Sequence, residues 1–156
     1  MSQNIPSQVR SARSEDVDDL LGLWKLLYSD VDQVSTAPWA GNTRAWFTES
    51  IKDITSTRIP VIEVDGAVVA AAIGTVEIGV PNPYCPRGRT VRLANVVTLP
   101  EHRSHGYGSM LVADVIAWAR TVQADRVDLS ATPDGQRLYE RLGFVMTTAP
   151  RMKLVL

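Results

Sequence analysis

The sequence predicts a mixed α/β domain in which four helices flank a central sheet of six to seven strands. Apolar side chains recur at helical spacing over residues 17–28 and again over residues 108–122. Between these two segments, apolar runs at 59–64 and 67–78 are joined by an Asp-Gly pair, which is typical of a hairpin turn. Helical segments that alternate with strands in this way are expected to cover the faces of the sheet.

In the N-terminal half we expect a short strand, two helices joined by a loop, and a hairpin. Ser14, followed by two acidic residues, favours a helix start, because a hydroxyl can cap the first turn and acids stabilise it. Asn42 or Thr43 can cap the second helix. In order, the expected elements are residues 9–12, 17–28, 42–54, 59–64 and 67–78.

The C-terminal half is expected to hold four strands and two helices. A loop with three prolines, residues 81–88, separates it from the hairpin. Gly143 favours the end of the last helix, because glycine readily takes the left-handed conformation found there. In order, the expected elements are residues 90–99, 108–122, 127–131, 136–142, 144–148 and 152–156.

Composition and charge exclude several classes of protein. The chain has 156 residues, a length that suits one domain over residues 1–156. Its formal net charge of -1 favours no nucleic-acid partner, and no apolar run approaches the length that spans a membrane. The N-terminus lacks the basic start and apolar core of a signal peptide, so we expect a cytoplasmic protein. One cysteine, Cys85, and two histidines favour neither a disulfide framework nor a metal site.

The turn at residues 103–108 is the strongest candidate for a ligand site. Backbone N–H groups in the first turn of a helix have no partner within the helix, and the peptide dipoles add positive charge there. A glycine-bearing turn between a strand and a helix can therefore hold a phosphate. This turn lacks the third glycine of a dinucleotide fingerprint and the lysine of a P-loop. Taken alone, Gly106 and Gly108 are equally compatible with a tight turn that binds nothing.

Residues 95–108 resemble the acyl-CoA-binding motif of the GNAT superfamily (Gcn5-related N-acetyltransferases), in which a strand leads through Q/R-x-x-G-x-G/A into a helix. Residues 138–144 are similar to the second signature of that family, because Tyr139 precedes a Gly-Phe pair by four residues. The two signatures stand in the family's order, and the resemblance covers residues 91–146. It implies a GNAT-like fold and an N-acetyltransferase that uses acetyl-CoA as its co-substrate.

The resemblance also implies how the donor is held. Backbone amides of the turn would contact the pyrophosphate of coenzyme A, and a splay in the strand 93–99 would free a main-chain N–H for the thioester carbonyl. Arg103 and His105 could add positive charge, or could be solvated side chains that only brace the turn. Thr132 stands where the family often has an asparagine on the pantetheine arm. The expected cofactor-binding residues are Val97, Thr98, Leu99, Arg103, Ser104, His105, Gly106, Tyr107, Gly108, Ser109 and Thr132.

The resemblance makes Tyr139 the general acid, because a phenol can protonate the leaving thiolate. The alternative is a tyrosine that packs half-buried on the helix 136–142. Strand 90–99 carries no carboxylate, so Glu77, at the end of the preceding strand, is the nearest candidate for the base. A water relay, or an acceptor that arrives neutral, would need no base residue.

The acceptor is expected to be the primary amine of a small molecule, which two long loops would recognise. Asp32 in the first loop suggests a cationic acceptor, and Trp39 and Tyr84 could line its pocket. Trp46 could line the same pocket or belong to the core. Asn95, which is unusual in an apolar strand, could hold a bulge, bind a neighbouring strand or face the substrate.

Direct transfer is favoured over a covalent acyl-enzyme, because Cys85 lies in a proline-rich loop with no histidine near it in the sequence. Two rival functions stay open: an acetyltransferase for protein or peptide amines, and an acyl-CoA-binding domain without activity. A homodimer is equally compatible with the sequence.

Overall fold

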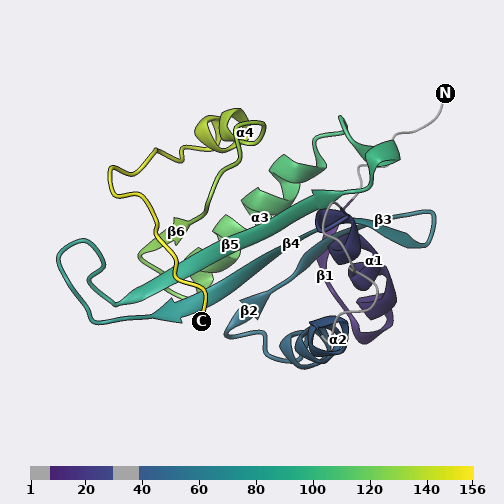
Figure 1. Ribbon diagram of the computed structural model, residues 1–156, viewed down its shortest axis with the longest axis horizontal. Coiled ribbons are helices and arrows are strands. Elements are labelled where there is room, and N and C mark those ends of the chain that lie inside the picture. The colour runs from purple at the N-terminus through teal and green to yellow at the C-terminus, as the bar shows by residue number, and fades with distance from the viewer. Residues whose placement is uncertain (1–7, 30–38) are drawn as a thin grey trace.

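A computed structural model describes residues 8–29 and 39–156, and in them a six-stranded sheet carries four α-helices (Figure 1). The strands lie in the order β1-β3-β4-β5-β6, and β2 also pairs with β4. Only β5 and β6 run parallel within these ranges, so the sheet is mixed, as expected. The strands are β1 Val9–Ser11, β2 Thr57–Arg58, β3 Pro60–Val64, β4 Ala67–Ile78, β5 Arg89–Thr98 and β6 Arg126–Asp128. The helices are α1 Val17–Leu27, α2 Trp39–Ser50, α3 Tyr107–Thr121 and α4 Gln136–Arg141. None of the helices in the described ranges is long and apolar enough to cross a membrane.

Helices cover both faces of the sheet: α1 and α2 lie on one side of it and α3 on the other (Figure 1). Val61 and Ile62 are neighbours on β3 that point to opposite faces, and both are fully buried. The same holds along β4, where every residue from Val68 to Ile73 is buried. A strand covered on both faces is a nearly continuous apolar run, which is how β4 appears in the sequence.

Two expectations about the helix starts are wrong. The second helix begins at Trp39, three residues before its expected cap, and the Thr43 hydroxyl donates to the Trp39 carbonyl at 2.9 Å. Trp39 packs on Tyr28 of the preceding turn, with ring centroids 6.0 Å apart. Because this contact joins residues that are distant in the sequence, no capping residue in the sequence marks this helix start. The segment from Ser14 to the first helix is not capped by the Ser14 hydroxyl: its N-cap is Arg13, whose N–H donates to the carboxylate of Asp16 at 2.7 Å.

The sheet is also shorter at its C-terminal edge than expected. β6 ends at Asp128, and residues 144–156 form no strand. A strand exists only where a neighbour exchanges backbone hydrogen bonds with it, and no strand within the described ranges lies beside this segment. The prediction of two strands at 144–148 and 152–156 is therefore wrong for the single chain.

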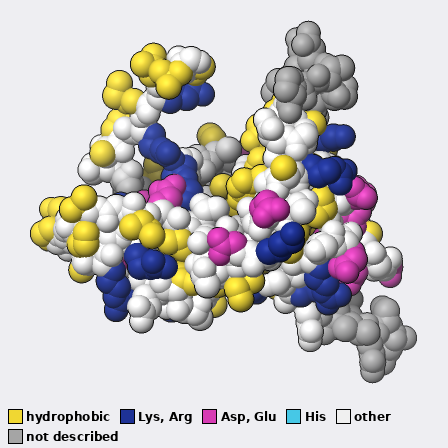
Figure 2. Space-filling model, turned by 90° about the horizontal axis from the view of Figure 1, so that it is seen from below, with side chains coloured by type: hydrophobic (Ala, Val, Ile, Leu, Met, Phe, Trp, Pro, Cys, Tyr) yellow, Lys and Arg dark blue, Asp and Glu magenta, His cyan; other side chains and the backbone are white. Residues whose placement is uncertain are grey.

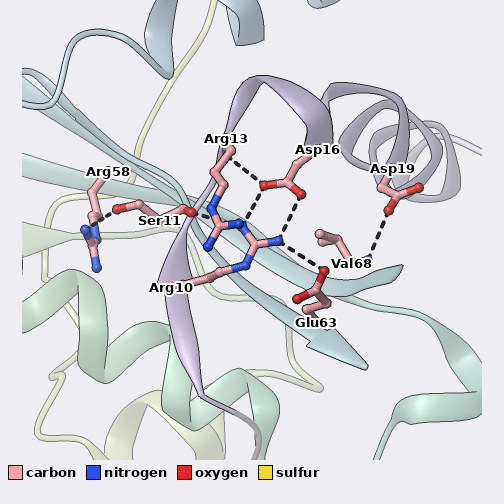
Figure 3. A network of polar contacts seen from close by, with 8 residues as sticks. All are labelled: Arg10, Ser11, Arg13, Asp16, Asp19, Arg58, Glu63 and Val68. Atoms are coloured by element: carbon pink, nitrogen blue, oxygen red, sulfur yellow. Dashed lines mark hydrogen bonds and ion pairs between the residues drawn. The ribbon is translucent and has the colours of Figure 1, made fainter. Parts of the chain in front are cut away.

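A polar network joins the start of the chain to the sheet (Figure 3). The guanidinium of Arg10 donates to both carboxylate oxygens of Asp16, at 2.7 and 3.0 Å, and lies 3.6 Å from Glu63. Asp16 also accepts the backbone N–H of Arg13 at 2.7 Å. Burial opposes the charge on Asp16, but the hydrogen bonds from Arg10 and Arg13 outweigh it and lower the pKa of Asp16. Asp19 of α1 accepts the N–H of Val68, so side chains clamp α1 to the β3–β4 hairpin.

Candidate functional site

A β-bulge interrupts β5 at Asn95. Ala71 pairs with Val97 and Ile73 pairs with Ala94, so two residues of β5, Asn95 and Val96, lie opposite one residue of β4. Asn95 has φ of 56°, in the left-handed region that asparagine tolerates better than most residues. The asparagine in an apolar strand thus holds a bulge, which was one of the alternatives left open by the sequence. A bulge bends its strand and re-aims the backbone groups beside it.

Beyond its first residues, one edge of β5 has no strand partner. β6 pairs with β5 only over 90–92, and no strand pairs with that edge over 93–98 in the described part of the chain. The Arg92 guanidinium donates to the Ser130 hydroxyl at 2.8 Å, just past the last paired residue of β6. The bulge therefore lies where the edge of β5 is open to an added partner.

The turn after β5 ends in an uncapped helix N-terminus. Ser104 and Gly106 have φ of 65° and 77°, and α3 follows at once with no side chain capping it. No acidic residue lies in the first turn of α3. Backbone N–H groups at such an end have no acceptor within the helix, and the helix dipole makes the end positive. An end of this kind suits an anion.

The two glycines of the turn have different tasks. A Cβ on Gly106 would meet nothing within 4 Å, so this glycine is needed for its positive φ alone. A Cβ on Gly108 would lie 3.3 Å from Cδ2 of Leu138 and 3.9 Å from Cγ1 of Val96. Gly108 therefore lies where the start of α3, the bulge of β5 and α4 meet.

The charged side chains of the turn contact its own backbone. Nε of Arg103 donates to the Thr98 carbonyl at 3.3 Å. Nδ1 of His105 lies 2.9 Å from the His102 carbonyl and 2.8 Å from the Arg103 carbonyl, so a proton on Nδ1 would be shared between them. The His105 ring also stacks on Tyr107, with centroids 5.5 Å apart. Both residues brace the turn while their side chains stay close to the helix N-terminus.

Tyr139 projects from α4, next to the same junction. Its ring is half-buried and packs edge-on against Phe144 at 5.9 Å. A Cβ on Gly135 would lie 3.1 Å from this ring, and the Thr132 carbonyl accepts the Gly135 N–H at 3.0 Å. Burial raises the pKa of Tyr139, which keeps the phenol protonated. Its oxygen makes no hydrogen bond within the described residues, so the proton is free for another partner.

The structure does not bring Glu77 to the bulge. Glu77 is exposed and pairs with Thr90, five residues before Asn95 on β5, which corresponds to about 16 Å along the strand. Tyr84 lies further away, in the loop between β4 and β5, and is exposed. Asp32 lies outside the described residues.

An unpredicted aspartate anchors the loop that holds Tyr84. The Cys85 thiol donates to Asp125 Oδ2 at 3.0 Å, and the backbone N–H groups of Arg87 and Arg89 donate to the same oxygen at 2.9 and 3.3 Å. Cys85 is buried at this end of the hairpin, remote from the bulge. Asp125 left no signal in the sequence, because it is a single acid next to a strand.

On the face of β5 opposite α3, Asn95 and Val97 line a small cavity together with residues of α1 and α2. Two aromatic rings, Trp24 and Phe47, line it, and they belong to a chain of ring contacts whose centroids lie 5.3 to 6.0 Å apart. Trp39 belongs to this group, and Trp46 packs on the buried Phe47 with 40% of its surface exposed. Sequence reasoning did not assign Trp24, Tyr28 or Phe47 to this group, although the four-residue spacing of Trp24 and Tyr28 on a helix was visible. The rings are those of Trp24, Tyr28, Trp39, Trp46 and Phe47.

Known proteins share both the sequence pattern and the fold. Residues 24–144 match the Acetyltransferase (GNAT) family, a range that includes the bulge, the turn and α4. No curated protein matches the chain. A GCN5-related N-acetyltransferase from Ralstonia eutropha is similar with a TM-score of 0.80 at 24% identity, over 94% of this chain and 97% of that one. A predicted acetyltransferase from Clostridium acetobutylicum, solved with acetyl-CoA, reaches 0.82 at 18% identity over 95% of each chain.

Glucosamine-6-phosphate N-acetyltransferase from Arabidopsis thaliana has a TM-score of 0.73 at 17% identity, over 94% of this chain and 97% of that one. At these identities the likenesses show the fold, whereas the family match covers most of the sequence. The chain belongs to the acetyltransferase (GNAT) family.

Proposed function

We propose that this protein transfers the acetyl group of acetyl-CoA directly to the primary amine of a small molecule. The observation that carries the proposal is the junction of three elements at Gly108: an uncapped helix N-terminus, the β5 bulge and the helix that bears Tyr139. Family membership supports acetyl transfer from acetyl-CoA as the chemistry.

In this proposal the donor lies along backbone groups. The pyrophosphate of coenzyme A binds the N–H groups at the start of α3, where Ser104 to Ser109 turn into the helix. The pantetheine arm lies along the unpaired edge of β5 at Val97 to Leu99, much as an added strand would. A main-chain N–H beside the bulge then donates to the thioester oxygen and stabilises the oxyanion that forms there.

The reaction needs two proton movements. The nitrogen lone pair of a neutral amine attacks the thioester carbon, a C–N bond forms, and the C–S bond breaks as the tetrahedral intermediate collapses. Tyr139 gives its proton to the departing thiolate, and water takes the proton that the amine nitrogen loses. Water acts as the proton acceptor because Glu77 lies too far along β4 to reach the bulge directly. The products are an acetamide and coenzyme A.

A small acceptor is favoured by the aromatic face beside the bulge. Trp24 and Phe47 line a small cavity with Asn95, and the half-buried Trp24 gives this face a flat apolar surface. A structural neighbour, glucosamine-6-phosphate N-acetyltransferase, is named for a small acceptor. Peptide amines and binding without catalysis are the rival outcomes.

The test is an assay of free thiol release from acetyl-CoA with a panel of small amines and of peptides with free N-termini or lysines. Turnover on small amines, lost in Tyr139→Phe and kept in Tyr84→Phe, is the expected result. Turnover on peptides alone would show that the acceptor is a peptide amine and not a small molecule. CoA binding without turnover on any amine would show that the protein binds acyl-CoA without catalysing transfer. No binding of CoA would overturn the proposal.

A further inference from the structure

One side-chain contact joins β5 to the chain after β6 at the point where the two strands separate. The strands pair only over residues 90–92 of β5 and 126–128 of β6. After β6 the chain turns away from β5 toward α4 (Figure 1). The Arg92 guanidinium reaches across this divergence and donates to the Ser130 hydroxyl at 2.8 Å. This hydrogen bond therefore lies at the inner end of the open edge of β5, which is its unpaired edge over residues 93–98.

The Arg92 side chain lies on the face of the sheet that carries α1 and α2. Arg92 pairs with Thr75 of β4, and paired residues share a face. Ile73, two residues before Thr75, belongs to the core cluster under α1 and α2. Gly74, between them, faces α3, because a Cβ there would lie 2.8 Å from Cγ1 of Val115. Since side chains alternate along a strand, Thr75 and Arg92 share the face of Ile73, which is also the proposed acceptor face.

The cover provided by α1 and α2 ends close to Arg92. On this face of β4, Ile73 is buried, Thr75 is half-buried and Glu77 is exposed. Figure 2 shows the molecule hollowed between an arm with hydrophobic side chains and the larger part of the surface, with Lys or Arg side chains at the foot of the arm. Arg92 itself is half-buried. Its side chain therefore covers the inner end of the open edge where the helices no longer do.

On the opposite face, the inner end of the open edge is apolar. Leu93 of β5 is 3% exposed, and Leu129, just before Ser130, is half-buried in the same cluster beneath α3. Only residues 93 and 94 separate Arg92 from the bulge at Asn95, a stretch of about 7 Å along the strand. This stretch is thus short, apolar toward α3, and ends at the hydrogen bond between Arg92 and Ser130.

In the proposed function, on which this inference rests, the donor runs toward Arg92. With the pyrophosphate at the start of α3 and the pantetheine arm along residues 97–99, the thioester lies beside the bulge, and the acyl chain continues toward residues 93 and 94. An acetyl group needs little of this length. Each further carbon adds up to about 1.5 Å, so the six additional carbons of an octanoyl chain would carry it to Arg92.

We propose that Arg92, held in place by Ser130, restricts the acyl group of the donor to short chains such as acetyl. The arginine side chain occupies the path of a longer chain, and it cannot move aside without losing its hydrogen bond to Ser130. A guanidinium that an apolar chain covers also loses contact with water, which is costly for a charged group. Arg92 touches neither the thioester carbon nor the amine, so it determines specificity and takes no part in the chemistry.

Isothermal titration with acetyl-CoA, butyryl-CoA and octanoyl-CoA tests the restriction in the full-length protein without an acceptor. The native chain should bind octanoyl-CoA about tenfold more weakly than acetyl-CoA, because a close-fitting site discriminates between chain lengths on at least this scale. In Arg92→Ala the two should bind almost equally. The ratio of two dissociation constants within one variant does not depend on how much of the protein is folded, so a merely structural role of Arg92 would leave it unchanged.

Variants of Ser130 and Arg126 separate the position of the Arg92 side chain from the pairing of the strands. Ser130→Ala frees the guanidinium and should lower the ratio in part, whereas Ser130→Thr keeps a hydroxyl and should keep the native ratio. Arg126→Ala is the matched control, because this exposed arginine of β6 pairs with Asp128 at 3.3 Å and lies away from the open edge. It should keep the native ratio as well.

The outcomes distinguish this inference from the proposed function. Octanoyl-CoA bound as tightly as acetyl-CoA by the native chain, or a native ratio in Arg92→Ala, would overturn the restriction and leave acetyl transfer as proposed. Binding of no acyl-CoA of any length would overturn both. The expected ratios together with no turnover on any amine would support the restriction in a protein that binds acyl-CoA without transferring it.

Discussion

The proposed donor site of this molecule and its proposed acceptor face are built in different ways. At the donor end, the bulge at Asn95, the turn at Gly106 and the start of α3 present backbone groups whose positions are fixed by unusual φ angles. On the acceptor face, side chains of α1 and α2 supply the surface, and a side-chain network clamps α1 to the sheet. Backbone sites depend on a few local residues, whereas side-chain sites depend on how distant elements pack.

The largest expected effect is on catalysis at the donor end. Tyr139→Phe should lower kcat by about 100-fold, because a positioned general acid contributes on that scale, and should leave KM for acetyl-CoA nearly unchanged. Since burial raises the pKa of Tyr139, the native rate should persist to higher pH than an ordinary phenol would allow. Steady-state kinetics across pH provide the measurement, with Tyr84→Phe as the matched control. A native kcat in Tyr139→Phe would remove this residue from the mechanism.

The next largest effect is expected on folding stability, from the Arg10–Asp16 interaction in the network that clamps α1 to the sheet. Asp16→Asn should cost about 2 kcal/mol of folding free energy at pH 7, because it removes charge-assisted hydrogen bonds to Arg10. The pKa of Asp16 is lower in the folded state, so the unfolded state binds more protons as the pH falls. The stabilisation is therefore complete above the unfolded pKa of about 3.9 and is lost as pH falls through the folded pKa. Urea unfolding at pH 7 and below pH 4 measures it.

In the same experiment, Asp18→Asn is the control, because Asp18 is an exposed partner of Arg44 and contributes little. If Asp16→Asn and the native chain lost stability in parallel as the pH fell, the clamp would not depend on this carboxylate.

A smaller effect is expected from filling the junction at the donor end. Gly108→Val should weaken acetyl-CoA binding about tenfold, since a larger side chain pushes Leu138 and Val96 apart and overpacking costs about 1–3 kcal/mol. Isothermal titration with acetyl-CoA gives the affinity. Gly22→Ala in α1, where a Cβ meets nothing within 4 Å, should bind as the native chain does. Native affinity in Gly108→Val would mean that the junction does not shape the donor site.

The smallest effect is expected on thermal stability at Asn95, where substitutions distinguish a role of the backbone conformation from a role of the side chain. Asn95→Val should lower stability by about 1 kcal/mol, because a β-branched residue is strained at φ of 56°, and this corresponds to a fall of about 2–4 °C in Tm. Asn95→Gly should keep the native Tm within about 1 °C, since glycine accepts that φ. Thermal unfolding distinguishes them. Equal losses in both variants would show that the amide side chain, not the backbone conformation, matters here.

The same contrast explains what the sequence could predict. The turn, α3 and α4 follow from glycines, apolar periodicity and the Tyr139 signature, all of which are local. The left-handed Asn95 was visible only as an odd residue, because a bulge needs its partner strand to be recognised. The approach of Trp24 to Asn95 was not predictable, because it depends on how α1 packs over the sheet. The remoteness of Glu77 follows from register, which no local pattern fixes.

We propose that acetyl-CoA is held above all by backbone N–H groups at the junction of β5 and α3. Amide nitrogen–proton NMR spectra, recorded while acetyl-CoA is added, test it directly. The amides of residues 97–99 and 104–109 should shift most, and those of the hairpin loop at 82–88 should stay in place. Shifts concentrated in the hairpin loop, or none at 104–109, would show that these backbone groups do not hold acetyl-CoA.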